Sequence, residues 1–83
     1  MIYLLQYDRQ TGSLVGNRAF NDSQRQLAEE ARLALELEAL RADVSLEIVL
    51  LEAMSEQALR RTHRRYFETI EQLLAVVDKA HAV

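Results

Sequence analysis

The sequence predicts a two-layer α+β fold with the element order β-β-α-β-α. Three observations predict it. Residues 2–20 hold two runs of β-forming residues around an Asp…Gly turn, residues 44–51 hold a third such run, and apolar residues recur at helical spacing in 27–42 and 55–79. We expect a three-stranded antiparallel sheet with the first strand in the centre, the third strand beside it, and both helices on one face.

Length and composition limit the chain to one domain, residues 1–83. Hydrophobic residues make up 49% and charged residues 28%, a balance typical of a soluble globular protein. There is no cysteine, no proline and only two glycines, which excludes a disulfide scaffold, a thiolate metal site and a flexible linker. No apolar run has the length of a membrane helix and no secretory signal is present, so we expect a cytoplasmic protein that is not bound to a membrane.

The first element is a β-hairpin. Its first strand lies in residues 2–7, and Asp8 stands four places before Gly12. An aspartate can accept backbone hydrogen bonds inside a turn, and glycine adopts a positive φ without steric cost. Ser13 to Phe20 form the returning strand, in which Gly16 indicates a bulge or a close approach of the backbone.

A helix follows the hairpin. Asn21, Asp22 and Ser23 are all typical N-cap residues, and Gln24 stands three places after Asn21, where a capping-box partner belongs. Apolar residues then recur at spacings of three and four as far as Ala42.

Residues 44–51 allow two interpretations. Valine and isoleucine favour a strand at Val44, Ile48 and Val49, because β-branched residues fit a pleated surface. The alternative is that these residues continue the preceding helix, which would give a β-hairpin followed by a long helical hairpin. We prefer the strand, followed by a second helix that begins at Ser55 and runs to about Lys79.

The chain carries more apolar surface than one copy of this fold hides. On the first helix, a second row of leucines lies apart from the face that meets the sheet, and two helices on one side would leave the other sheet face open. A leucine or valine removed from water contributes about 1.5–3 kcal/mol. We therefore predict a homodimer, the commonest protein assembly. The interface candidates are Tyr3, Tyr7, Leu33, Leu37 and Leu40.

A basic segment lies in the second helix. Four arginines on one helical face favour binding of phosphates or of an acidic partner. Glu56 and Glu68, each four places from an arginine, instead favour ordinary ion pairs on the helix surface, and Tyr66 and Phe67 fall on the apolar stripe. We therefore keep nucleic-acid binding as an alternative. The arginines are Arg60, Arg61, Arg64 and Arg65.

The sequence gives little support for an enzyme. It contains no catalytic triad, phosphate loop, metal-binding helix or calcium loop, so we expect no metal and no cofactor. His63 and His81 would stand roughly 27 Å apart on one helix and cannot share a metal within one chain. A polar or ligand site near Glu38, His63 and Tyr66, at a dimer seam, is the residual enzyme hypothesis.

Together these observations favour a small homo-oligomeric protein-interaction or accessory module. Its partner is first of all a second copy of itself, and then another protein. Nucleic-acid binding through residues 60–65 and a small enzyme at a dimer seam are the alternatives.

Overall fold

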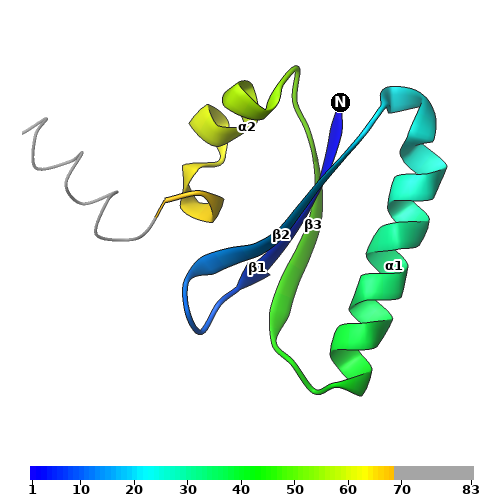
Figure 1. The fold of residues 1–83 in the computed structure, drawn as a ribbon, viewed down its shortest axis with the longest axis vertical. Coiled ribbons are helices and arrows are strands. Elements are labelled where there is room, and N and C mark those ends of the chain that lie inside the picture. Colours follow the sequence, from blue (N-terminus) through cyan, green and yellow to red (C-terminus); the bar gives the residue numbers. More distant parts are fainter. Residues whose placement is uncertain (69–83) are drawn as a thin grey trace, which may run out of the picture.

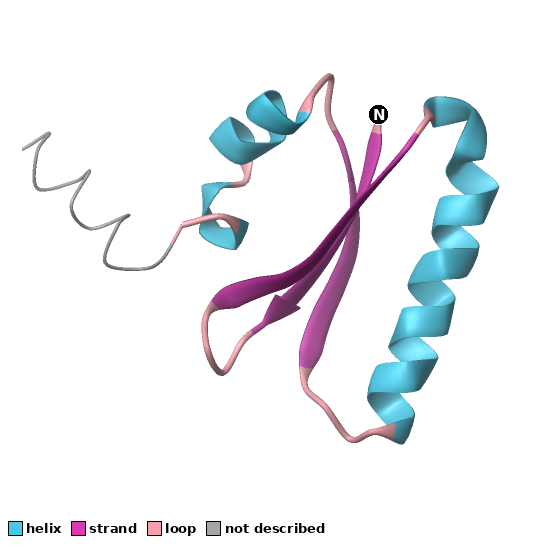
Figure 2. Cartoon of the chain, viewed as in Figure 1, coloured by secondary structure: helices cyan, strands magenta, loops and turns pink. Residues whose placement is uncertain are grey.

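The computed structural model describes residues 1–68 and has the α+β fold that the sequence predicts. The sheet order is β2-β1-β3, with β1 in the centre and antiparallel to both neighbours, as expected (Figure 1). Figure 2 shows the same elements by type. In chain order they are β1 (Ile2–Asp8), β2 (Ser13–Phe20), the 3-10 turn η1 (Asp22–Gln24), α1 (Arg25–Arg41), β3 (Leu46–Glu52), α2 (Glu56–Thr62) and the 3-10 turn η2 (Arg64–Tyr66).

The central strand β1 is buried on both of its faces. Ile2 and Leu4 face α1 and join a core cluster that includes Phe20 and Ala28. Tyr3 and Leu5 face the opposite side and join a second cluster. Successive side chains of a strand point to opposite faces, so an uninterrupted apolar run such as residues 2–5 requires cover on both.

The prediction that both helices lie on one face of the sheet is wrong. Leu59 of α2 and Tyr66 of η2 pack in the second cluster, whereas α1 packs in the first. Figure 1 shows the sheet standing between α1 and the α2–η2 segment. The physical reason is the apolar second face, which sequence reasoning assigned to a partner molecule and which this chain covers itself. The expected two layers are therefore three.

The hairpin is built as predicted. Gly12 has φ +67°, and its backbone N–H donates to the Asp8 carbonyl at 2.8 Å. The Asp8 carboxylate accepts the N–H of Gln10 at 2.9 Å. The register of β2 on β1 shifts between Gln6 and Tyr7, so that Val15 is left unpaired beside Gly16. A Cβ at Gly16 would stand 2.5 Å from the Gln6 amide nitrogen, so Gly16 lies at both a bulge and a close approach.

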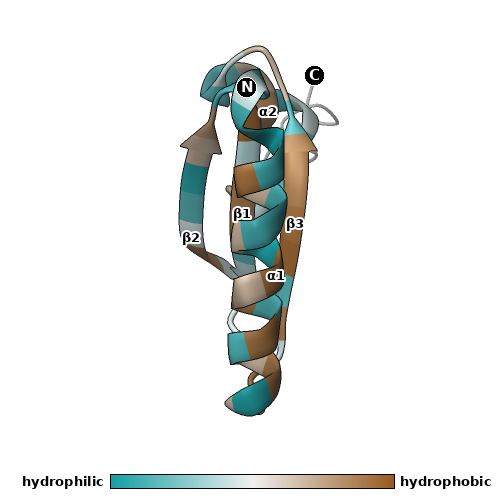
Figure 3. Ribbon diagram, turned by 90° about the vertical axis from the view of Figure 1, so that its right-hand side faces the viewer, coloured by the Kyte–Doolittle hydropathy of each residue, from teal (hydrophilic) through white to brown (hydrophobic). Residues whose placement is uncertain are grey.

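The capping residues begin the 3-10 turn η1, and α1 follows directly at Arg25. The Gln24 side chain accepts the backbone N–H of Asn21 at 2.9 Å. The helix then lies over β3 and β1, with β2 to one side (Figure 3). After Arg41 the chain turns at Asp43, whose φ is +54°, and enters β3. Residues 46–52 are thus a strand, and the long helical hairpin is excluded.

The second helix begins as predicted but ends early. The Ser55 hydroxyl accepts the N–H of Ala58 at 3.1 Å and caps α2. The helix stops at Thr62, and His63, with φ −126° and ψ 52°, is not helical. The expected continuous helix is therefore wrong at His63, and its part from residue 69 to Lys79 lies outside the described residues. The break lets η2 fold back so that Tyr66 reaches Tyr7.

Two leucine substitutions test this packing. Leu59 is fully buried under the sheet, whereas Leu40 is 76% exposed on α1. We expect Leu59→Ala to lower the free energy of unfolding by about 2–4 kcal/mol through lost burial and cavity formation. Leu40→Ala, the matched control, should change it by less than about 0.5 kcal/mol. Urea unfolding measures both, and equal effects would contradict the second core cluster.

Candidate interaction surfaces

The clearest surface feature is a row of three leucines on the outer side of α1. Leu33, Leu37 and Leu40 are 56%, 44% and 76% exposed. At about 100° per residue, they point roughly opposite to Ala28 and Leu35, which pack on the sheet. We call these three residues the leucine row. It adds nothing to the core of the described residues, and its spacing of four and three places the three leucines on one face of α1.

The two tyrosines predicted as interface residues pack against other parts of the chain, Tyr3 fully buried and Tyr7 half-buried. Tyr3 is buried in the second core cluster. Tyr7 packs edge-on against Tyr66, with ring centroids 5.3 Å apart. Of the five interface candidates, only the members of the leucine row are therefore exposed on the described part of the chain.

Three of the four arginines in the basic segment are paired with carboxylates. Arg60 contacts Glu56 at 3.1 Å, and its guanidinium carbon stands 4.6 Å from the Phe67 ring centroid. Arg64 donates two hydrogen bonds to Glu68, at 3.2 and 2.8 Å. These are the pairs that the spacing predicts. Arg61 is exposed and has no carboxylate contact among residues 1–68.

The third pair, Arg65 with Glu47, joins η2 to β3. Arg65 Nη2 donates to both carboxylate oxygens of Glu47, at 2.9 and 3.0 Å, and to the Tyr66 hydroxyl at 2.6 Å. The guanidinium carbon also stands 4.2 Å from the Tyr66 ring centroid. Arg9, from the hairpin turn, approaches Glu47 at 3.7 Å. Sequence reasoning gave Glu47 no role, because its partner is 18 residues away and no local pattern links them.

The contacts within this cluster shift the pKa values of its members. Hydrogen bonds from Arg65 hold the pKa of Glu47 below its ordinary value. The same contact raises the pKa of Arg65, and burial raises the pKa of the Tyr66 hydroxyl. We call Glu47, Arg65 and Tyr66 the clasp, because their contacts hold η2 on the sheet. Arg65 contributes the ion pair to it, and Tyr66 contributes apolar surface.

The predicted polar site at Glu38, His63 and Tyr66 is not assembled within the chain. Glu38 is exposed on α1, on one face of the sheet, while His63 and Tyr66 lie on the opposite face. The nearest partner of His63 is the Thr62 hydroxyl, 2.8 Å from Nδ1. Because the helices occupy different faces, the sheet separates the first residue from the other two.

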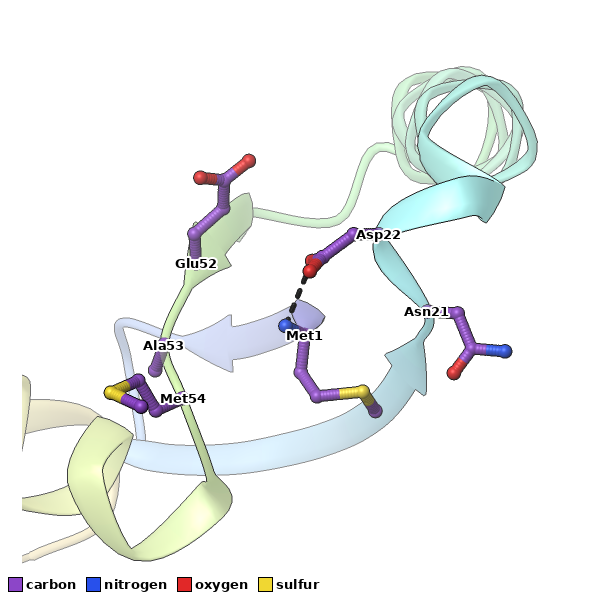
Figure 4. Close-up of a pocket in the computed structure, with 6 residues that line it drawn as sticks. All are labelled: Met1, Asn21, Asp22, Glu52, Ala53 and Met54. Atoms are coloured by element: carbon purple, nitrogen blue, oxygen red, sulfur yellow. Dashed lines mark hydrogen bonds and ion pairs between the residues drawn. The ribbon is translucent and has the colours of Figure 1, made fainter.

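An open groove lies at the end of the sheet where the chain begins (Figure 4). Its volume is about 740 Å³ and its lining includes Met1, Asp22, Glu52 and Met54. The amino terminus contacts the Asp22 carboxylate at 2.8 Å, which lowers the pKa of Asp22. The two methionines give it an apolar rim, but no converging set of polar groups marks a reaction centre.

Neither a metal site nor a membrane span occurs in the described residues. Within residues 1–68 no three histidine, aspartate or glutamate side chains are grouped to hold a metal ion. Over the same residues, no helix has the length and apolar character needed to cross a membrane.

Comparison of the chain with protein-family models, with curated proteins and with solved structures finds no match. Any functional conclusion therefore depends on the surfaces described above.

The clasp predicts a pH-dependent stability. Because its pKa is lowered in the folded chain, Glu47 stabilises the fold above the ordinary carboxyl value of 4.5, and this contribution is lost as the pH falls through the lowered value. We expect Glu47→Gln to lower the unfolding free energy at pH 7 by about 1 kcal/mol or less, since the pair is partly solvated.

Urea unfolding of wild type and variant between about pH 7 and pH 3 measures this difference. It should begin to shrink below pH 4.5, where the carboxyl of the unfolded chain takes up its proton first, and should disappear once the pH is below the lowered pKa, where protonated Glu47 resembles glutamine in the folded chain too. Glu38→Gln, at an exposed carboxylate on α1, is the control and should change the unfolding free energy at pH 7 by less than about 0.5 kcal/mol. If the difference in unfolding free energy between wild type and Glu47→Gln stays constant down to about pH 3, the negative charge of Glu47 is not what stabilises the fold.

Proposed function

We propose that this chain is a homo-oligomeric protein-interaction module that presents the leucine row of α1 to a partner protein. The observation that carries the proposal is the exposure of Leu33, Leu37 and Leu40 on the side of α1 away from the sheet. The partner chemistry that fits is the apolar stripe of an amphipathic helix, because a row at i, i+4 and i+7 matches helix-on-helix docking.

The energetics support a binding surface rather than an incidental one. Full burial of one leucine contributes about 1.5–3 kcal/mol relative to exposure. Burial of the three exposed leucines of this row would therefore contribute several kcal/mol of binding free energy that the described fold does not use. Scattered exposed apolar residues are normal, but a contiguous row along one helix is typical of an interface.

The two alternatives receive less support. For nucleic-acid binding, Arg60, Arg64 and Arg65 already hold carboxylates, so phosphate binding would have to displace those contacts. The chain as a whole has a net charge of −3. For an enzyme, the groups expected at the site lie on opposite faces of the sheet.

Analytical ultracentrifugation tests the homo-oligomeric part of the proposal. We expect the mass of the full chain to rise toward that of a dimer or larger species between about 1 and 100 μM, the range of modest association constants. A folded monomer throughout this range would contradict self-association.

A matched pair of variants tests the leucine row. The triple variant Leu33→Gln, Leu37→Gln and Leu40→Gln keeps helix propensity and removes the apolar surface. The control carries Glu30→Gln, Ala34→Gln and Glu38→Gln, which are exposed elsewhere on α1. Both variants should unfold within about 1 kcal/mol of wild type, since neither set packs in the core.

Both variants then serve as baits in nuclease-treated lysate. We expect a protein that wild type and control capture and that the leucine variant loses. Equal capture by all three baits, or capture abolished by nuclease, would contradict the proposal, and the second outcome would favour the nucleic-acid alternative.

A further inference from the structure

The two edges of the sheet are unequal. The β2 edge is interrupted by the bulge at Val15 and carries Asn17 and Arg18, features that discourage strand addition. The β3 edge has a continuous seven-residue register with β1, no bulge, and neither proline nor a basic residue. Within residues 1–68, β1 is the only strand paired with β3.

The side chains of β3 are also incompletely covered. Residues 46–51 are apolar except for Glu47, yet each is only half-buried, whereas residues 2–5 of β1 are buried. Ile48 and Leu50 contact the α1 cluster, and Val49 and Leu51 contact the other cluster. One more strand beside β3 would pair its open edge and cover these side chains laterally on both faces.

The flank of α1 that lies toward this edge is self-complementary. Arg25, Glu29, Arg32 and Glu36 are exposed and follow one another at spacings of four, three and four, which places them in one row. The contact between Arg25 and Glu52, at the end of β3, fixes this row on the β3 side. Its charges alternate in sign, so an antiparallel copy can pair Arg25 with Glu36 and Glu29 with Arg32, each twice. These pairs would add to the contacts that Arg25 makes with Glu52 and Arg32 with Glu36 within one chain.

We propose that two copies of this chain associate about a two-fold axis, with β3 pairing antiparallel to β3 of the partner and the Arg25–Glu36 flanks of the two α1 helices in contact. This inference rests on the proposed homo-oligomeric state and specifies its interface. The product is a continuous six-stranded sheet with both α1 helices on the same face.

The distance expected between the two α1 helices agrees with this arrangement. Strands lie about 4.8 Å apart, and α1 lies over β3 and β1, so the two α1 axes would be separated by about two strand spacings. That separation, about 10 Å, is the normal distance between packed helices.

The α1 flank and β3 also predict the same position for the two-fold axis. The midpoint of the row from Arg25 to Glu36 lies 5.5 residues after Arg25, which is about 8 Å along α1 at 1.5 Å per residue. A two-fold axis between two antiparallel strands passes beside a residue that faces its own copy, because directly opposite residues point to the same side of the sheet. A distance of about 8 Å from Glu52 along β3, at 3.3 Å per residue, reaches Val49 or Leu50 to within half a residue. That is the centre of the apolar part of β3. The helix flank and the strand thus share one axis.

Charge exchange tests the pairing. Glu29→Arg and Arg32→Glu each place like charges together twice in a homodimer, so each should weaken dimerisation about tenfold or more by ultracentrifugation. The double variant Glu29→Arg/Arg32→Glu, and an equimolar mixture of the two single variants, restore opposite charges and should dimerise within about threefold of wild type. Circular dichroism verifies that each variant is folded.

Backbone hydrogen exchange tests the strand. The amides of residues 46–52 should become more protected as the concentration rises through the dimerisation range, and the leucine variant should behave like wild type. A monomeric wild type would overturn both the proposed function and this inference. An oligomer that the leucine substitutions dissociate, with charge exchange and β3 protection unchanged, would overturn this inference alone and leave the homo-oligomeric module standing.

Discussion

The burial of β1 on both faces is the constraint on which the rest of the structure depends. Four consecutive apolar residues, Ile2 to Leu5, send side chains alternately to either side of the sheet, and all four are buried. A three-stranded sheet with such a centre is unstable with one bare face. The chain therefore places α1 on one side and brings Leu59 and Tyr66 to the other.

That constraint also decides what stays exposed. One helix is too narrow to cover three strands, and α1 lies over β3 and β1, so its flank toward β2 is open to solvent. Glu38, which the helical pattern places near the apolar arc, lies on that flank and is exposed. The leucine row lies on the outer side of α1, where no element of the described fold can reach it. The exposed surfaces thus follow from the position of α1 over the sheet.

The parts of the fold that local chemistry determines were predictable from the sequence. The turn from Asp8 to Gly12, the capping pair Asn21 and Gln24, and the Ser55 cap each depend on residues within four places of one another. The strand at residues 46–52 followed from its β-branched residues. The face on which α2 lies was not predictable in this way, because it depends on contacts between Leu59 and residues more than 50 places earlier.

The same limit applies to the functional residues. The leucine row was found from helical periodicity, since exposure on a helix follows from angle alone. The clasp between Glu47 and Arg65 was missed, because it exists only once η2 has folded back on β3. The end of α2 at Thr62 was missed as well: no glycine or proline stands there, and the Thr62 hydroxyl bonds to the carbonyls of Ala58 and Leu59 instead.

The unequal sheet edges connect the fold to its proposed use. Strand β2 is protected by its own bulge, whereas β3 keeps a regular edge beneath a helix flank of alternating charge. If two copies join at β3, both α1 helices lie on one face of the sheet, and their leucine rows lie on that face too. Self-association through the strand would leave the leucines free and bring two rows together. Pairing with a copy and binding a partner protein would then use different surfaces of the same helix.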